Sequence, residues 1–289
     1  MRLLRPALFT SALIAAIGLA GCAAPKDQAG GASSAPATSA SCTKDSLQTL
    51  KPGTLTVGTD KPAYEPWFAK NDPSNGQGYE SAVAYALAEK LGYAKNEVAW
   101  AVVPFNSAYA PGTKTFDLDL NQVSISDQRK KAVDFSSGYY DVRQTVITTK
   151  GSKIAGTTKI ADLKPAKLGA QVGTTSLKAI GDVIGASAAP AVFDSNDAAV
   201  QALKNKQIDG LVVDLPTAFY MTAAQLDDGV IVGQLPASGG ATEQFGAVLA
   251  KGSPLTSCVS QAVNGLRTDG TLDRLAKQYL TGAGAPELS

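Results

Sequence analysis

The sequence predicts an α/β protein, and two observations support this prediction. Short β-rich runs alternate with stretches of helical periodicity in the first half, and the second half repeats the theme. Such alternation is typical of parallel sheets with helices on both faces. From Asp45 onward the chain is long enough for two modest cores or one large one. With 44% apolar and 18% charged residues, wholesale disorder is excluded.

The first half of the folded part is expected to contain a strand, a helix and two further strands, at 54–58, 80–91, 98–103 and 116–123. In the helix, Val83, Ala86, Leu87 and Leu91 recur at helical spacing on one face.

The second half repeats the alternation, and a helix N-cap is expected at Ser195. Strands are expected at 167–172, 191–193 and 208–213, and helices at 174–184 and 195–205. Two C-terminal helices, 254–267 and 272–280, follow on either side of a turn at 268–270.

The charge balance and the missing histidines exclude several function classes. Lys and Arg number 26 against 25 Asp and Glu, so there is no basic surface to attract a nucleic acid. The chain has no His, which removes Ser-His-Asp and Cys-His catalysis and the commonest zinc ligand. We therefore expect no catalytic residue, metal site or cofactor.

The N-terminus has the pattern of an export signal. Arg2 and Arg5 precede an apolar run at 7–20, which is shorter than the roughly 20 apolar residues that a membrane-spanning helix needs. The run ends in Leu19-Ala20-Gly21-Cys22, which resembles a bacterial lipobox, so residues 1–21 are expected to be removed and Cys22 to carry lipid. A plain signal peptide with a chance cysteine is the alternative.

Residues 22–44 are expected to form a flexible tether behind this lipid. Residues 23–41 are almost entirely Ala, Gly, Ser, Thr, Pro and Gln, a composition that cannot bury a core. Lipidation of Cys22 leaves Cys42 and Cys258, and an even pair in an exported protein predicts a disulfide, with two free thiols as the alternative. The protein is thus expected outside the cytoplasm, anchored to the outer face of the bacterial cytoplasmic membrane.

Polar and aromatic side chains follow several predicted strands, where ligands bind in open α/β sheets. These candidates are Asp60, Tyr64 and Trp67; Asn121, Gln122, Ser124 and Arg129; Gly173, Thr174 and Thr175; and Asp214.

The chemistry of this set describes a free α-amino acid. Arg129 offers a planar fork for a carboxylate. The Gly173-Thr174-Thr175 run opens a helix, whose N-terminus suits an anion, and Asp214 would receive an ammonium group. Each has an alternative: Arg129 as solvated surface, the run as a mere helix start, Asp214 as a helix cap, and the aromatics Tyr64 and Trp67 as core or rim.

Together these residues resemble the family 3 solute-binding proteins of bacterial amino-acid ABC importers, over about 50–280. The most specific stretch is 124–136, SISDQRKKAVDFS, which is similar to a family signature. Residues 169–175, GAQVGTT, resemble the second-lobe motif, and residues 269–271, DGT, resemble the C-terminal turn. The resemblance implies a periplasmic-binding-protein-like (type II) fold of two lobes, joined by two hinge strands near 141–146 and 244–249.

The resemblance also implies roles for the candidates. Arg129 and Thr175 match contacts to the ligand α-carboxylate, and Asp214 matches the acceptor of its ammonium. The remaining matches are first-lobe contacts at Asn121, Gln122 and Ser124, a side-chain contact at Asp60, and an aromatic stack at Tyr64 or Trp67. Two departures leave the ligand's identity open: Ala82 replaces a second acid, and Asn121 and Gln122 are larger than the usual small residues.

The expected function is therefore a monomeric receptor that closes two lobes on a polar amino acid and delivers it to an ABC permease and its ATPase. The predicted lobes are residues 45–141 plus 244–289, and residues 142–243. Two alternatives remain: an exported prephenate or arogenate dehydratase-like (cyclohexadienyl dehydratase-like) enzyme using Glu65 or Glu80 as a general acid, and an amino-acid sensor without transport.

Overall fold

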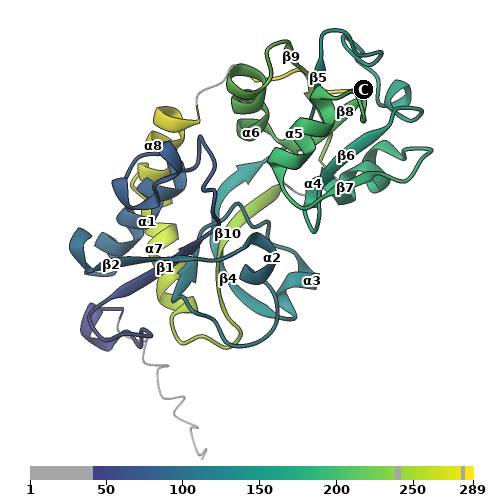
Figure 1. Ribbon diagram of the computed structural model, residues 1–289. Helices are drawn as coiled ribbons and strands as arrows, with labels where there is room; N and C mark the ends of the chain where they lie inside the picture. The colour runs from purple at the N-terminus through teal and green to yellow at the C-terminus, as the bar shows by residue number, and fades with distance from the viewer. Residues whose placement is uncertain (1–41, 238–241, 281–283) are drawn as a thin grey trace, which may run out of the picture. The chain divides into compact units, whose positions relative to one another are not determined.

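The computed structural model describes residues 42–237, 242–280 and 284–289. The predicted signal peptide, Cys22 and nearly all of the predicted tether lie outside these residues. In the part of the chain that is described, no helix is long and apolar enough to cross a membrane. The described strands form two separate sheets, each with its own helices (Figure 1).

The first sheet has the strand order β2-β1-β3-β10-β4. Its strands span Leu55–Thr59 (β1), Val98–Val102 (β2), Leu118–Asp119 (β3), Val133–Val142 (β4) and Glu243–Ala250 (β10). β1 runs parallel to β2 and β3, whereas β10 runs antiparallel to β3 and β4. The prediction of a parallel sheet was therefore correct for the pairs that β1 forms with β2 and β3. It was wrong for the pairs of β10, because β10 returns from the second sheet in the opposite direction.

The second sheet repeats this design with the order β7-β6-β8-β5-β9. Its strands span Gln144–Thr149 (β5), Leu168–Gln171 (β6), Ala191–Phe193 (β7), Gly210–Asp214 (β8) and Gly229–Gln234 (β9). β6 runs parallel to β7 and β8, and β5 runs antiparallel to β8 and β9.

The longest helices lie where the hydrophobic periodicity placed them. The α-helices span Tyr79–Lys90 (α1), Phe105–Ala108 (α2), Asp127–Lys130 (α3), Thr175–Ala179 (α4), Asn196–Lys204 (α5), Leu215–Tyr220 (α6), Thr256–Thr268 (α7) and Thr271–Tyr279 (α8). Two π-helical segments, Ile180–Ile184 and Met221–Gln225, continue α4 and α6. Short 3-10 turns occur at Lys44–Ser46, Ala69–Asn71, Pro73–Asn75, Lys95–Glu97 and Ile160–Leu163.

Side-chain caps explain where several helices begin. The Ser195 hydroxyl accepts from the Ala198 amide at 3.2 Å, as predicted. The Thr174 hydroxyl does the same for the Leu177 amide at 3.1 Å, so α4 begins one residue later than expected.

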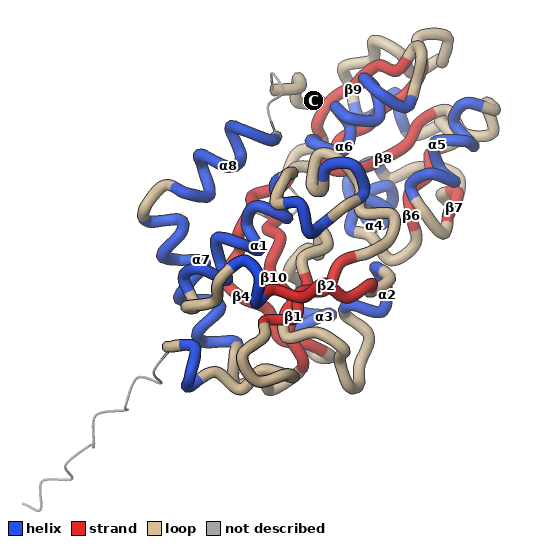
Figure 2. The backbone as a smooth tube through the Cα atoms, turned by 60° about the vertical axis from the view of Figure 1, so that its left-hand side comes forward, coloured by secondary structure: helices blue, strands red, loops and turns tan. Residues whose placement is uncertain are grey.

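The first-sheet helices α1, α7 and α8 pack together along one side of that sheet (Figures 1 and 2). Their apolar side chains, among them Leu87 and Val263, form one core with Val57 of β1, and a smaller cluster covers the opposite face. The second sheet likewise has an apolar cluster on each face. Each sheet therefore has its own core.

The order of the described elements takes the chain from one sheet to the other at three places. Arg143 alone separates β4 from β5, and residues 235–242 separate β9 from β10. The third passage follows α8: Glu287 bridges Gln234 of β9, and Leu288 is buried in a second-sheet core. The predicted lobe boundaries grouped residues 284–289 with the first lobe, but they pack on the second sheet (Figure 1) because Leu288 finds its apolar partners there.

Strand β3 is much shorter than the predicted strand at 116–123. The chain leaves the ladder after Asp119, because Gln122 adopts a left-handed backbone conformation with φ of 51°. A single bridge from Ser124 to Phe245 of β10 is all that continues the pairing on this side of the described sheet. The early end of β3 leaves residues 121–124 as a loop at the carboxyl end of the sheet.

Cys42 and Cys258 form the predicted disulfide, with the two sulfur atoms 2.07 Å apart. The bridge joins the start of the described chain to α7, across a sequence separation of 216 residues. Closing so long a loop restricts the unfolded chain, which by the chain-entropy model stabilises the fold by up to about 5 kcal/mol.

Candidate functional site

A polar cavity lies between the strand ends of the two sheets. Its lining comes from both: Asp60, Tyr64, Phe105, Asn121, Gln122, Ser124, Arg129, Gln171, Thr174, Thr175, Ser176, Asn196 and Asp214. The structure therefore brings together most of the residues that the sequence singled out for ligand binding. Gly173 and Trp67 do not line the cavity, although the Gly173 carbonyl accepts a hydrogen bond from Arg129.

Arg129 is buried in the wall of this cavity. It lies in α3, whose N-cap Ser126 accepts from the Arg129 amide at 3.2 Å. Only 8% of the residue is exposed, so the alternative of a solvated surface arginine is wrong. Burial lowers the pKa of the guanidinium, which nevertheless stays protonated because an arginine titrates so high.

The guanidinium of Arg129 is held by carbonyl oxygens and rings. It donates to the carbonyl of Ser124 at 2.7 Å and to the carbonyl of Gly173 at 2.9 Å. The central carbon of the guanidinium, Cζ, lies 4.3 Å from the centre of the Tyr109 ring and 5.6 Å from the centre of the Phe105 ring. No described carboxylate forms an ion pair with Arg129 within 4 Å, so its charge is held in place without being neutralised by a direct partner.

The second sheet supplies Thr175, the first residue of α4, which contacts the first-sheet loop directly. Its hydroxyl lies 3.2 Å from that of Ser124. With the bond from Arg129 to Gly173, this contact joins the two sides of the cavity. The predicted helix start after β6 therefore lies against Arg129, as the ligand hypothesis requires.

Asp214 ends strand β8, and its carboxylate is not the helix cap that the sequence left open. No side-chain cap bond is formed at the start of α6. Instead Asp214 Oδ1 accepts from Gln144 Nε2 at 3.0 Å, because these residues face each other in the antiparallel β5–β8 register. Burial, followed by the negative charge of Glu243, raises the pKa of Asp214 well above its usual range.

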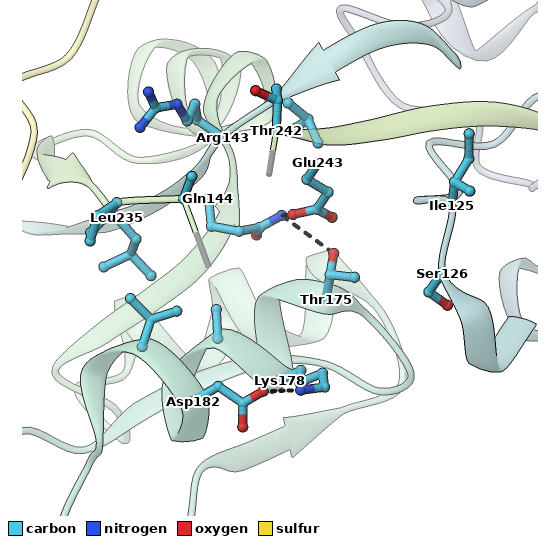
Figure 3. Close-up of a pocket in the computed structure, with 15 residues that line it drawn as sticks. Ile125, Ser126, Arg143, Gln144, Thr175, Lys178, Asp182, Leu235, Thr242 and Glu243 are labelled. Atoms are coloured by element: carbon cyan, nitrogen blue, oxygen red, sulfur yellow. Dashed lines mark hydrogen bonds and ion pairs between the residues drawn. The ribbon is translucent and has the colours of Figure 1, made fainter. Parts of the chain in front are cut away.

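Gln144 and Glu243 extend this acidic region on the side away from the cavity. Gln144 Nε2 also donates to Glu243 Oε2 at 3.1 Å, while the side-chain carbonyl oxygen of Gln144 accepts from the hydroxyl of Ser176 at 2.6 Å. Both side chains line a second cavity of about 360 Å³ beside the chain passages between the sheets (Figure 3).

Asp60 and Tyr64 line the cavity from the loop after β1. The Asp60 carboxylate accepts from the amides of Lys61 at 2.7 Å and Phe105 at 3.1 Å, and burial raises its pKa. Burial and the negative charges of Asp197 and Asp60 raise the pKa of Tyr64 to about 12. At neutral pH, Tyr64 is therefore a neutral hydroxyl beside a carboxylate.

Glu80 lies behind the cavity wall and does not line the cavity. It is fully buried, and it accepts from the Gln122 amide at 2.8 Å, from the Gln122 side chain and from the hydroxyl of Tyr139. Burial raises the pKa of Glu80 to about 7, although these three bonds oppose the shift. Its position indicates that Glu80 holds the left-handed Gln122 in place.

Trp67 lies in the core and is fully buried, contrary to its prediction as a ligand contact. Its ring meets those of Tyr79, Tyr140 and Phe245 edge-on, and its Nε1 donates to Thr217 of α6 at 3.0 Å. Aromatic spacing after a strand does not distinguish a side chain that points to the cavity from one that points to the core. Of the two predicted aromatic contacts, only Tyr64 lines the cavity.

Several residues of the site were not predicted from the sequence. Phe105 follows β2 and lines the cavity, so the rule that led to the other candidates would have found it. Tyr109, Gln144 and Glu243 gave no such signal, because they reach the site through contacts between distant segments. The described residues contain no group of three or more Cys, Asp or Glu side chains arranged to hold a metal ion.

Comparison with known proteins agrees with this geometry. The sequence model of the bacterial extracellular solute-binding proteins, family 3, matches residues 55–282. The L-cystine-binding protein TcyJ of Escherichia coli K12 is 30% identical over 231 residues, which are 78% of this chain and 82% of the relative. The arginine-binding extracellular protein ArtP of Bacillus subtilis is 29% identical over 238 residues, 79% of this chain and 86% of that protein.

Solved structures share the fold. An ancestral arginine-binding protein bound to arginine is 30% identical, with a TM-score of 0.65 over 79% of this chain and 99% of its own. The ancestral amino acid-binding protein AncCDT-1, described as a precursor of cyclohexadienyl dehydratase, is also 30% identical, with a TM-score of 0.65 over 79% of this chain and 96% of its own. The two-sheet architecture is thus that of amino acid-binding proteins.

Proposed function

The chain belongs to the bacterial extracellular solute-binding proteins, family 3, and we propose that it binds a polar α-amino acid between its two sheets. The observation that carries the proposal is the cavity in which Arg129 of the first sheet meets Thr175 and Asp214 of the second. A cation and an anion on opposite sides match the two charged groups that every free α-amino acid has in common.

Binding would be coupled to closure of the lobes. Arg129 would receive the carboxylate, and Thr175 and Asp214 would contact the ligand as the second sheet approaches. Closure excludes water, which strengthens the charged contacts. Two relatives are named for cystine and arginine, which supports a polar ligand.

The receptor would serve an ABC importer, delivering its ligand to a permease driven by an ATPase. Lipid on Cys22 would keep it at the outer face of the cytoplasmic membrane, with residues 22–44 as the tether. The likeness to a precursor of cyclohexadienyl dehydratase keeps an enzyme as the alternative. Neither glutamate considered for its general acid, Glu65 or Glu80, lines the cavity, so the site favours binding without chemistry.

Calorimetric titration of the purified, ligand-stripped protein with the twenty amino acids tests the proposal. We expect one or a few polar amino acids to bind with a dissociation constant near micromolar, about −8 kcal/mol. Absence of binding across the panel, with prephenate or arogenate turned over instead, would favour the enzyme.

A further inference from the structure

Glu243 is a carboxylate whose position is fixed by the hinge. It is the first residue of β10, and it pairs with Val142 at the end of β4, two residues before Gln144. Its Oε1 accepts from the Ser124 hydroxyl at 2.5 Å, and its Oε2 accepts from Gln144 Nε2 at 3.1 Å. Glu243 is therefore bonded to a first-sheet loop and to a second-sheet strand at once.

The same amide nitrogen of Gln144 also donates to Asp214 at 3.0 Å. An amide has two N–H bonds, and the Gln144 carbonyl is occupied by the hydroxyl of Ser176. The same nitrogen also lies 3.3 Å from the Thr175 hydroxyl, so its two N–H groups are shared among three acceptors, of which Asp214 and Glu243 are the nearer. The two carboxylates are held close together by one neutral donor.

Arg129 acts electrostatically on both carboxylates, but no described cation forms an ion pair with either of them. The charged groups that act on Asp214 are Glu243, Glu80 and Arg129. The negative charge of Asp214 in turn helps to raise the pKa of the Tyr140 hydroxyl. Among these charged groups only Arg129 is a cation, and it makes its bonds to carbonyl oxygens. The second cavity is lined by Glu243 together with Arg143, Lys178 and Asp182 (Figure 3). Of these, Arg143 pairs with Glu287 and Lys178 pairs with Asp182.

We propose that Glu243 is a specificity-determining positioning residue, which acts through Gln144 and Asp214 to form a like-charged pair that the ligand's positive group relieves. Asp214 lines the ligand cavity, whereas Glu243 does not, so Glu243 acts without touching the ligand. The pair destabilises the ligand-free protein by repulsion and favours a ligand that brings a positive charge to Asp214. The predicted effect on ligand preference rests on the proposed amino-acid function, whereas the repulsion between the two carboxylates does not.

The repulsion is tested in the ligand-free protein by a double-mutant cycle of Asp214→Asn and Glu243→Gln. These changes keep the shapes of the side chains. At pH 8 each variant should melt higher than the unchanged protein by about 3 °C, the effect of roughly one pKa unit in a domain of this size. The double variant should melt about 3 °C below the sum of the two gains, because only one repulsion exists to remove.

Repeating the double-mutant cycle at lower pH gives a second test of the repulsion. The pKa of Asp214 is raised, so its carboxyl takes up a proton well before an ordinary aspartate does, and the repulsion ends with its charge. The non-additivity should therefore be present at pH 8 and fall toward zero near pH 4. Glu287→Gln is the matched control, since this exposed carboxylate near the hinge pairs with Arg143 and should show no coupling to Asp214→Asn.

The predicted effect on ligand preference is tested by titrating Glu243→Gln with the twenty amino acids. Affinity for the amino acid that binds best should fall about tenfold, with little change for its α-hydroxy acid analogue, which has no ammonium. Additive melting shifts at pH 8 would overturn the proposal whether or not any ligand is found. Coupled melting with unchanged amino-acid affinity would overturn the ligand role. No binding to the unchanged protein would refute the proposed function alone, since the melting cycle still decides the pair.

Discussion

The two charged ends of the cavity are built in opposite ways. At the arginine end, formed by Arg129 with Phe105 and Tyr109, one cation is held by two carbonyl oxygens and two rings. At the acidic end, formed by Asp214, Gln144 and Glu243, two carboxylates share one amide. The arginine end has no substitute for its charge, whereas the acidic end has a second negative charge close by. The two ends should therefore respond differently to the loss of one residue.

Removing the arginine should have the largest effect. Arg129→Ala should weaken amino-acid binding about 1000-fold, because the ligand carboxylate would be buried without its partner. Calorimetric titration measures the change. Lys130→Ala is the matched control, since this exposed neighbour lies outside the cavity lining and should leave affinity unchanged. Normal binding by Arg129→Ala would show that the site is wrongly assigned.

Glu80, which lies behind the cavity wall and bonds Gln122, should make stability depend on pH. Its carboxyl has a pKa of about 7 in the folded protein, above the ordinary 4.5, so the folded state binds its proton more tightly. Its stabilising contribution is complete below about pH 4.5 and is lost as pH rises through 7, a change of about 3 kcal/mol.

This effect is measured by urea unfolding of the unchanged protein and Glu80→Gln between pH 4.5 and 8. The variant has no carboxyl to titrate at this position. Its free energy of unfolding relative to the unchanged protein should therefore rise by about 3 kcal/mol across this range. A constant difference between the two proteins would mean that Glu80 titrates like an exposed glutamate.

Removing one acid should weaken binding less than removing the arginine. Asp214→Asn should reduce amino-acid affinity about 30-fold, the low end for a buried charge pair, because Glu243 still attracts the ammonium group. Titration of this variant beside Arg129→Ala gives the ratio of the two losses. Equal losses would contradict the difference between the two ends.

The smallest effect should come from the ring beneath the arginine. Tyr109→Ala should weaken binding about fivefold, in the range of one cation–π contact. Tyr109→Phe keeps the ring over Arg129 and serves as the control, with an expected change below about twofold. A loss that is equal in both variants would assign the effect to the hydroxyl, which also bonds the Gly173 carbonyl at 3.3 Å.

Residues near a strand end were predictable from the sequence, because their place in the chain fixes their place in the sheet. Arg129 and Thr175 come after strands and belong to quoted motifs, whereas Asp214 is the last residue of β8 and was found by its position alone. The disulfide was predictable because the lipobox accounts for Cys22 and leaves an even pair of cysteines in a protein with an export signal. The end of β3 could not be predicted from the local sequence. The run at 116–123 is typical of a strand, but β3 ends early because Glu80 holds Gln122 in a turn.

Contacts between distant segments could not be predicted in this way. Gln144 meets Glu243 across 99 positions, and their meeting depends on how two sheets are registered. Trp67 was misassigned because the sequence does not tell which side of the loop faces the core. Asp119 is fully buried, no described residue bonds its carboxylate, and its pKa is raised well above the usual range. Nothing in its neighbouring sequence indicates this.

The central claim is that Arg129 receives the carboxylate of an amino acid between the two sheets. Its most direct test is a titration of the unchanged protein and Arg129→Ala with the best-binding amino acid and with its methyl ester, which has no free carboxylate. We predict that the unchanged protein prefers the amino acid about 100-fold and that Arg129→Ala binds both equally weakly. An ester bound by the unchanged protein as tightly as the amino acid would contradict the account.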